Sequence, residues 1–424
     1  MLEPGFVREE PELCKQNMKK KYQDPKVVDD FLKADAEWRK QKARVDQLRH
    51  DRNRISQDIN QAKKTGKGIK TLVKKAKKLP DKISRAEKKL AEQRQKSDLF
   101  LSKIHNIVHE SVSRGRDESA NKTIKEWGRI TRPGFPVLNH VEICENLGIA
   151  DFEASADTTG KGFYFLQGDL ALLNHALIRY SVDFMQKKGY EYIETPLMLK
   201  KNVLSASLDT QEFANTIYEV KEEDLVLIGT AEHSLLARYK DVVFTEKDLP
   251  KKVFSYSMCF RKEIGSHGIN EKGLWRTHQF NKVEQVVFCA PEDSYKMFEE
   301  LLRNSEKIMQ ALKLPYRLLE MCSGDLSAWK SKQVDIEVWR PTTQEYGEVA
   351  SLSNCTDYQA RDLNIQVDRQ GKRETVHALN NTALATSRIM VAIIENYQNK
   401  DGTITIPAVL VPYMNRKKII GRKK

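Results

Sequence analysis

Residues 259–284, CFRKEIGSHGINEKGLWRTHQFNKVE, bring together side chains that can bind a nucleotide. The guanidinium of Arg261 can hold a phosphate through two parallel hydrogen bonds, and the ring of Phe280 can stack on a purine base. The carboxylate of Glu284 can accept a substrate ammonium group, and three glycines bracket a polar loop that can close over a ligand. The stretch is therefore either a site for a triphosphate or a salt-bridged hairpin on the surface.

A hairpin would place these side chains on one surface. Side chains alternate across a strand, so Arg261 and Glu263 share a face with Cys259. If the charged faces of the two strands coincide, one side of the hairpin gathers arginines, carboxylates, a lysine and an aromatic ring. This set is more specific than the polar face that an exposed hairpin usually shows to solvent. The alternating set on the return strand is Arg276, His278, Phe280, Lys282 and Glu284.

The elements around this hairpin predict one mixed domain. ALLNHALIRYSVDFMQKKG (171–189) has the pattern of an amphipathic helix, and YEYIETP (190–196) follows as a short strand. Residues 224–239 indicate a strand, a turn and a helix, and residues 382–397 an apolar helix. Alternation predicts further strands in VFSYSMCFRKE, LWRTHQFNKVEQVVF and QEYGEVASLSN. Several neighbours are joined too tightly for crossover helices, so the predicted fold class is α+β, an antiparallel β-sheet flanked by helices.

An antiparallel helical hairpin is predicted before this domain. Residues 27–62 repeat apolar side chains at two heptad positions, which indicates a coiled-coil seam. KTGKG (64–68) interrupts the helix with two glycines, and a second seam follows. Pro80 removes one backbone hydrogen bond there and predicts a kink or a restart. The seam positions are Phe31, Ala34, Trp38, Gln41, Val45, Leu48, Arg52, Ile55, Ile59 and Ala62, then Leu72, Ala76, Leu79, Ile83, Ala86, Leu90, Gln93, Ser97, Phe100, Ile104 and Ile107.

The tip of this hairpin is strongly basic. Residues 63–78 contain eight lysines and no acidic residue, and residues 51–100 hold 16 basic against 6 acidic side chains in a chain of net charge +13. One interpretation is a solvated helix face. The other is an arm that follows the phosphates of a folded RNA, because lysines without aromatic residues suit backbone recognition. The lysines assigned to RNA are Lys63, Lys64, Lys67, Lys70, Lys74 and Lys75.

The remaining totals restrict the class of protein. A chain of 424 residues can form two or three domains, and no run of about 18 apolar residues indicates a membrane span. Six cysteines without a CxxC pair predict neither a zinc site nor a disulfide framework and favour the cytoplasm. The predicted parts are an N-terminal domain at 1–112 with its hairpin at about 27–108, a linker at 113–160 and a body at 161–424.

FRKE (260–263) and RTHQF (276–280) resemble motif 2 of the class II aminoacyl-tRNA synthetases, whose pattern is FRxE, a loop and (R/H)xxxF. HQFNKVE is most similar to the seryl-tRNA synthetase family, and NCTDYQAR and GSHG are typical of its archaeal or eukaryotic members. GTAEH (229–233) resembles the TxE loop of that family, the segment ending at Pro196 resembles motif 1, and LNNTALATSR resembles motif 3. The resemblance covers essentially the whole chain, because the N-terminal hairpin is similar to the family's tRNA-binding arm.

The resemblance implies a two-step reaction. Serine attacks the α-phosphate of ATP to give seryl-adenylate, and the terminal ribose hydroxyl of the tRNA then takes the seryl group. The implied catalytic residues are Arg261 on the α-phosphate, Arg388 on the outer phosphate, and Glu348. The implied ATP-binding residues are Arg261, Lys262, Glu263, Thr277, Phe280, Glu348, Val349, Ala350, Ser351 and Arg388. The implied serine-binding residues are Thr230, Ala231, Glu232, Arg261, Glu284, Asn380 and Thr382.

The resemblance also implies ligands and partners. ATP is a substrate, Mg²⁺ binds with it through Glu348 and Ser351 because hard cations prefer oxygen ligands, and no zinc is expected. The implied partners are L-serine, tRNA(Ser) and a second copy of the chain bound through the motif 1 region, without a membrane. The sequence leaves open whether tRNA(Sec) is charged as well.

Several of these residues have plain structural interpretations. Glu284 can be the salt-bridge partner of a hairpin residue, Thr230 the N-cap of the next helix, and Arg388 the cap of a buried helix end. All three residues occur together, in the order and at the spacing of the family, and this favours their interpretation as site residues. Three histidines without metal-ligand spacing are interpreted as structural or RNA-facing, namely His233, His267 and His278.

The sequence departs from the family pattern at three positions and leaves two rival functions. Gly347 stands where a basic residue often precedes the glutamate, Ala350 replaces a serine, and Trp329 lies in a run of usually small residues. A ligase that loads an amino acid onto a carrier protein typically lacks the long arm. A non-catalytic RNA-binding paralogue should have lost the arginines or carboxylates of the site, all of which are present.

Overall fold

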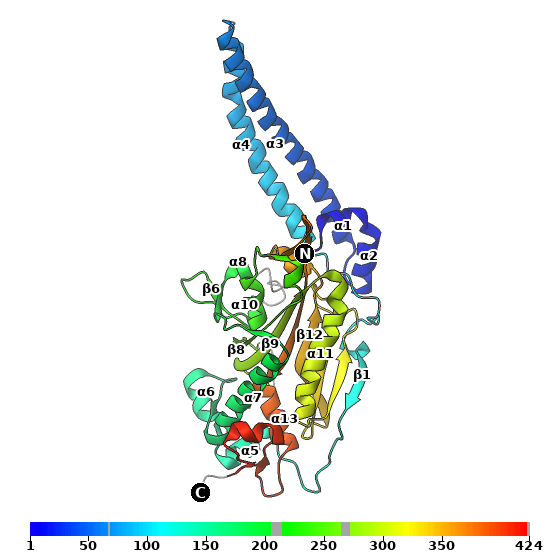
Figure 1. The fold of residues 1–424 in the computed structure, drawn as a ribbon, viewed down its shortest axis with the longest axis vertical. Helices are drawn as coiled ribbons and strands as arrows, with labels where there is room; N and C mark the ends of the chain where they lie inside the picture. The colour runs from blue at the N-terminus through cyan, green and yellow to red at the C-terminus, as the bar shows by residue number, and fades with distance from the viewer. Residues whose placement is uncertain (67, 205–213, 264–271, 422–424) are drawn as a thin grey trace. The chain divides into compact units, whose positions relative to one another are not determined.

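The computed structural model describes residues 1–66, 68–204, 214–263 and 272–421. The chain forms two compact units, Met1–Ile107 and Val108–Lys424 (Figure 1). The predicted division at 112 and 160 remains a prediction. Residues 113–160 contribute regular elements of the second unit, including strand β1 (Lys122–Trp127).

The first unit is helical. Two short helices, α1 (Pro4–Glu9) and α2 (Pro11–Lys20), each begin with a proline at the first position, where no backbone N–H is needed. Two long antiparallel helices follow, α3 (Lys26–Lys64) and α4 (Lys70–Leu101). They confirm the predicted hairpin.

The predicted seam lies between α3 and α4, except at Arg52 and at Ile104 and Ile107, which follow the end of α4 at Leu101. Phe31 and Val45 are buried in α3, and Ile83 is buried in α4. The polar side chain of Gln41 can be buried in the seam because its amide donates to the carbonyl of Ala86 at 2.9 Å. The prediction was wrong for Arg52, which is exposed, since the contact strip has rotated away from this position.

Helix α4 runs through Pro80 without a break, so the predicted restart is wrong. Proline removes a single hydrogen bond from the helix ladder. Leu79 and Ile83, on either side of it, are buried against the partner helix. Because tertiary packing provides most of the stability of such a helix, it continues across one missing bond.

The second unit is built on an eight-stranded sheet. All neighbouring strands are antiparallel except β4 and β8, which are parallel. This confirms the predicted α+β class with an antiparallel sheet. The order across the sheet is β1, β10 (Tyr316–Glu320), β11 (Lys332–Arg340), β12 (Glu345–Asn354), β15 (His377–Ala385), β9 (Gln279–Cys289), β8 (Lys251–Phe260) and β4 (Glu191–Tyr192).

The two faces of this sheet have different roles. Along β9, Val283 and Val287 point into the main apolar core, which also contains residues of α7 (Gly168–Lys187), α11 (Ser294–Ala311) and α13 (Thr386–Asn396). The alternate residues of β9 point to the other face, where Val286 and Phe288 join a second apolar cluster. By the same alternation, the even-numbered residues at the start of β9 point to this second face, where they can form a site.

Smaller elements complete the second unit. The helices are α5 (His140–Leu147), α6 (Glu153–Thr159), α8 (Lys201–Leu204), α10 (Ala231–Arg238) and α12 (Tyr358–Asp362). The strands are β2 (Ala150–Asp151), β3 (Phe165–Leu166), β5 (Met198–Lys200), β6 (Leu225–Leu227), β7 (Val243–Thr245), β13 (Gln366–Arg369), β14 (Lys372–Thr375), β16 (Ile404–Thr405) and β17 (Ile419–Ile420). Within the described ranges, no helix is long and apolar enough to cross a membrane.

Four predicted boundaries were wrong. The first strand of the hairpin ends at Phe260 rather than at Glu263, so Arg261 and Glu263 follow the strand. The strand predicted at 190–196 is reduced to the two residues of β4. The return strand of the hairpin begins at Gln279 rather than at residue 274. The start of the predicted helix 382–397 belongs to β15, because Thr382 pairs with Glu284 across the sheet. Local periodicity did not reveal these limits, which depend on strand pairing.

Candidate active site

A cavity of about 470 Å³ opens on the second face of the sheet. This volume suits a small-molecule ligand. Strands β8, β9, β11, β12 and β15 and the starts of α10 and α13 supply its walls. Of the residues predicted to bind ATP or serine, those that line the cavity are Thr230, Glu232, Arg261, Lys262, Glu263, Thr277, Phe280, Glu284, Glu348, Val349, Ala350, Ser351, Asn380, Thr382 and Arg388.

Four other residues singled out from the sequence have different surroundings. Ala231 is fully buried at the first position of α10 and does not line the cavity. His278 stacks on Phe163, with ring centroids 5.1 Å apart, and its Nδ1 contacts the Tyr218 hydroxyl. His233 does line the cavity, and burial, with nearby cationic side chains, lowers its pKa to about 3. His267 lies in the segment 264–271, which is outside the described residues.

The first arginine is held over an aromatic ring. The Nε of Arg261 donates to the carbonyl of Gly229 at 3.2 Å. Its guanidinium carbon lies 5.3 Å from the centroid of the Phe280 ring. Since the Nε bond fixes the plane of the group, its terminal nitrogens can face an anion in the cavity.

The second arginine pairs with a carboxylate. One terminal nitrogen of Arg388 donates to the backbone carbonyl of Glu348 at 2.8 Å and to its Oε2 at 3.0 Å. The Glu348 side chain lines the cavity and is 45% exposed. Desolvation of the carboxylate acts to raise its pKa, but the attraction of Arg388, together with that of Arg261 and Lys330, outweighs this effect and holds the pKa below the ordinary value. Glu348 is therefore an ionised carboxylate directed at the ligand space.

Asp335 is a second carboxylate near Glu348 that the sequence prediction missed. It pairs with Ser351 across strands β11 and β12. The Nε2 of Gln333 donates to Asp335 Oδ1 at 2.7 Å and to Ser351 Oγ at 3.1 Å. Burial, together with repulsion from Glu348, raises the pKa of Asp335 to about 7. The alternation of DIEVW (335–339) could have placed Asp335 on the cavity face, although Ser351 and Glu348 come from another strand.

Glu232 lies at the other end of the cavity. Its Oε1 accepts hydrogen bonds from the side-chain amides of Gln359 and Asn380, both at 3.0 Å. Burial and repulsion from Glu284 raise its pKa above the ordinary value. Thr230 caps helix α10, since its hydroxyl accepts from the Glu232 N–H at 3.2 Å. Its structural interpretation as an N-cap is thus correct, and it lines the cavity as well.

Glu284 forms a buried ion pair. Its Oε2 accepts from Lys282 Nζ at 2.8 Å and from the Thr382 hydroxyl at 3.2 Å. Both charged side chains are less than a tenth exposed. Within the described ranges no group donates to the other oxygen, Oε1, which leaves it available to a ligand. The structural interpretation of Glu284 as the salt-bridge partner of a hairpin residue is thus correct, and that residue is Lys282.

The Gly347 departure has a steric explanation. A Cβ atom at this position would lie 2.4 Å from the ring of Trp275, closer than real contacts allow. The guanidinium carbon of Arg388 lies 5.5 Å from the centroid of the same ring, and its Nε donates to the Trp275 carbonyl at 3.4 Å. Gly347 therefore makes room for a tryptophan that supports an arginine of the cavity.

Comparison with known proteins identifies the family. Residues 1–108 match the seryl-tRNA synthetase N-terminal domain, and residues 216–397 match the tRNA synthetase class II core domain (G, H, P, S and T). The chain is 44% identical to the serine--tRNA ligase of Methanocella arvoryzae over 98% of this chain and 99% of that protein. This chain belongs to the seryl-tRNA synthetase family. The predicted resemblance, and with it the fold of this family, is confirmed.

Solved structures of the family have the same fold. The seryl-tRNA synthetase of Pyrococcus horikoshii, solved in complex with ATP, superposes with a TM-score of 0.91 at 38% identity and full coverage of both chains. The cytoplasmic serine-tRNA ligase of Naegleria fowleri, in complex with AMP, gives a TM-score of 0.86 at 34% identity, with 98% of this chain and 96% of that chain covered. The family likeness therefore extends through both compact units.

Proposed function

We propose that this chain activates L-serine with ATP to seryl-adenylate and transfers the seryl group to the 3′ end of tRNA(Ser). The observation that carries the proposal is that Arg261 and Arg388 line the same cavity as Glu232, Lys282 and Glu284. Its charges match those of the two substrates. The predicted alternative, a non-catalytic RNA-binding paralogue, is not supported, because the arginines and carboxylates are present and the relatives are ligases.

The serine end binds by charge and hydrogen bonding. Glu284 is paired with Lys282, whereas the hydrogen bonds to Glu232 come from two neutral amides. The α-ammonium of serine restores neutrality beside Glu232, whose charged form is otherwise disfavoured by burial and repulsion. The serine hydroxyl donates to Glu284 Oε1. Alanine lacks this hydroxyl and would leave a buried carboxylate oxygen without a partner, which is costly.

The arginines hold the triphosphate of ATP. Arg261 binds the α-phosphate, Arg388 binds the outer phosphate, and the Phe280 ring supports the adenine. An oxygen of the serine carboxylate, already ionised, bonds to the α-phosphorus as the bond to the pyrophosphate oxygen breaks. Arg261 stabilises the charge that builds on the α-phosphate oxygens. Positioning and charge stabilisation suffice, and no side chain has to remove a proton.

The residues beside the phosphates also suit a magnesium ion. Glu348, Asp335 and Ser351 present hard oxygen atoms at one place, and burial together with repulsion from Glu348 raises the pKa of Asp335, a repulsion that a bound cation would relieve. Glu348 and Ser351 would hold the ion, with Asp335 next to them. A bound Mg²⁺ would neutralise phosphate charge and orient the triphosphate.

The tRNA contacts and the assembly are further parts of this proposal. Lys63, Lys64, Lys70, Lys74 and Lys75 are exposed around the helix ends of the hairpin, as a phosphate-binding arm requires. Lys67 lies outside the described residues. tRNA(Sec) is a second candidate substrate, because the arm would recognise RNA through shape and backbone rather than through bases.

A homodimer through the motif 1 region completes the proposal. Three apolar side chains near this region, Leu172, Leu197 and Met198, are 48%, 38% and 45% exposed. Exposed apolar residues gathered near one segment are typical of an interface. Light scattering coupled to gel filtration would give about twice the chain mass, whereas a monomer at micromolar concentration would contradict the dimer.

Amino-acid-dependent exchange of ATP and pyrophosphate tests the proposed activity. With Mg²⁺ present, serine should support exchange, and alanine, glycine, threonine and cysteine should support little. Deletion of residues 30–105 separates the two steps. Exchange should persist, while charging of tRNA(Ser) should be lost. If the wild type exchanges no pyrophosphate with serine but still binds RNA, the paralogue alternative is correct.

A further inference from the structure

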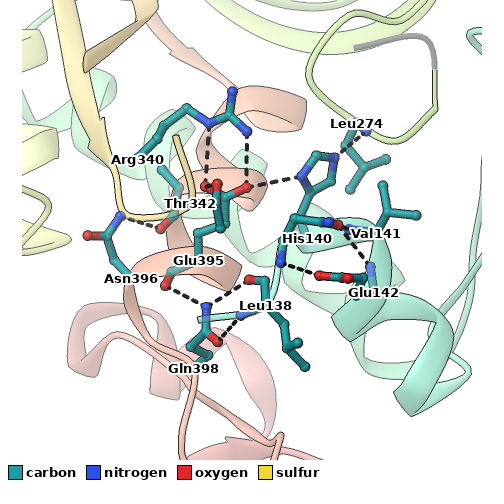
Figure 2. A network of polar contacts seen from close by, with 12 residues as sticks. Leu138, His140, Val141, Glu142, Leu274, Arg340, Thr342, Glu395, Asn396 and Gln398 are labelled. Carbon is teal, nitrogen blue, oxygen red and sulfur yellow. Dashed lines mark hydrogen bonds and ion pairs between the residues drawn. The ribbon is translucent and has the colours of Figure 1, made fainter. Parts of the chain in front are cut away.

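A buried polar network lies outside the lining of the cavity. Its centre is the carboxylate of Glu395 on α13, which is fully buried (Figure 2). Arg340, at the end of β11, donates to both carboxylate oxygens, through Nη2 at 3.1 Å and Nε at 3.4 Å. The Thr342 hydroxyl donates to Oε2 at 2.8 Å, and His140 Nδ1 contacts Oε1 at 3.1 Å. None of these four residues belongs to the cavity wall.

His140 connects this network to the end of the hairpin loop. Its Nε2 accepts a hydrogen bond from the backbone N–H of Leu274 at 3.1 Å, as Figure 2 shows. Because Nε2 accepts, the ring proton lies on Nδ1, which donates to Glu395. A Cβ atom at Gly273 would lie 2.2 Å from His140 Nε2, so only glycine allows the backbone to approach this closely.

The position of His140 is itself fixed from two sides. The Gln398 side chain accepts from the Leu138 N–H at 2.9 Å and donates to the Leu138 carbonyl at 3.0 Å. Asn139 caps helix α5 by accepting from the backbone N–H groups of Val141 and Glu142, both at 3.0 Å. A histidine held in this way can determine where the loop end lies, because it has little freedom of its own.

Arg340 extends the network to the cavity. Its guanidinium carbon lies 4.2 Å from the centroid of the Trp275 ring, within cation–π distance. The same ring approaches Arg388, whose Nε donates to the Trp275 carbonyl. Trp275 therefore contacts one arginine of the buried network and one arginine of the cavity. Two routes lead from Glu395 to Trp275, one through His140 and Leu274 and one through Arg340.

We infer that Glu395, His140 and Arg340 are positioning residues that hold residues 273–275 and thereby orient Arg388 toward the outer phosphate of ATP. The inference rests on the proposed function of the cavity. A buried ion pair is weak evidence for a contribution to stability, because desolvation offsets much of the attraction. The placement of this pair against Trp275 gives it a different role, which is to fix a planar support beneath a ligand-binding arginine.

The variant Arg340→Lys tests this inference in the full-length protein. Lysine keeps the charge beside Glu395 but loses the planar group that covers Trp275. The Michaelis constant for ATP in serine-dependent exchange should rise about three- to tenfold, while that for serine should change less than twofold. The conservative variant Glu395→Gln keeps the shape of the network and should change the Michaelis constant for ATP in the same direction by a smaller factor.

Arg317 provides a matched control. It also pairs with a carboxylate, Glu337, at 2.6 Å and covers an aromatic ring, Tyr346, at 5.0 Å, but none of these three residues lines the cavity. Arg317→Lys should leave the Michaelis constant for ATP unchanged. Unfolding temperatures measured for all variants separate positioning from stability, since a purely structural role would lower that temperature and leave the constant unaltered.

The outcomes distinguish the two proposals. If the wild type is active and Arg340→Lys leaves the Michaelis constant for ATP unchanged, the positioning role alone is overturned. If Arg340→Lys does not fold, the same result in Glu395→Gln overturns it. An equal effect in Arg317→Lys overturns it as well. A wild type that exchanges no pyrophosphate with serine overturns the proposed function, and this inference with it.

Discussion

Replacement of Glu284 by glutamine is the sharpest test of the serine end of the cavity. Glutamine has nearly the same shape, and Thr382 can still donate to its oxygen. The substitution removes the negative charge that Lys282 Nζ contacts at 2.8 Å and that the serine hydroxyl would contact at Oε1. The variant therefore changes the electrostatics of the pocket and preserves its volume.

The magnitude follows from the burial of this pair. A hydrogen bond to a charged group contributes about 1.5–3 kcal/mol, which corresponds to roughly 10- to 150-fold in a rate or binding constant. Because the Glu284 side chain is only 2% exposed, water cannot make up for the lost hydrogen bonds to the carboxylate. The kcat/KM for serine in the exchange assay should therefore decrease by a factor within this range, and the KM for ATP should change less than twofold.

A double variant separates binding from folding. Glu284→Gln leaves Lys282 as a buried unpaired charge, so the unfolding temperature should fall. Lys282→Met combined with Glu284→Gln removes both charges and should recover most of the stability without recovering serine activity. If Glu284→Gln keeps its kcat/KM for serine within twofold of the wild type, the assignment of Glu284 to the serine hydroxyl is wrong.

Three further predictions concern the arm, the pH dependence and the metal. Changing Lys70, Lys74 and Lys75 together to alanine should spare pyrophosphate exchange, weaken tRNA binding and reduce its dependence on salt concentration, as measured by filter binding. The pKa of Asp335 is about 7 in the folded protein against its ordinary 3.8, so the folded state binds this proton more tightly and stability falls as pH rises from about 4 to 7. Asp335→Asn should therefore raise the unfolding temperature at pH 8 but not at pH 4, in calorimetry without Mg²⁺. Chelation of magnesium by EDTA should abolish exchange, and Glu348→Gln should raise the magnesium concentration needed for half-maximal activity.

Local patterns predicted the part of the site that lies on one strand. Phe280, Lys282 and Glu284 alternate along β9 and line the cavity together, because the period of two holds wherever a strand is regular. The same pattern did not hold for His278, which precedes the strand and packs on Phe163. The residue at which β9 begins to pair with β8 depends on both strands, so the sequence of one strand cannot predict it.

Contacts between distant elements could not be predicted from the sequence. Asp335 meets Ser351 from the neighbouring strand, and Gln359 reaches Glu232 across 127 positions of the chain. Gly347 appeared only as a departure from the family pattern. The structure explains it through Trp275, which occupies the space that a side chain there would need. Such pairs follow from packing, which no periodicity or short motif encodes.

The distribution of charge explains how the proposed site would orient serine. Arg261 is held by a neutral carbonyl and an aromatic ring, and its charge also acts on the carboxylate of Glu348. Glu232 is held by two neutral amides, and the charges of Lys282 and Lys330 also act on it. An amino acid in the reverse orientation would place its carboxylate beside Glu232 and its ammonium beside Arg261, and both contacts would be repulsive. In the proposed site, electrostatics therefore favours the orientation with the serine carboxylate beside Arg261 and the α-phosphate, which the first reaction step requires.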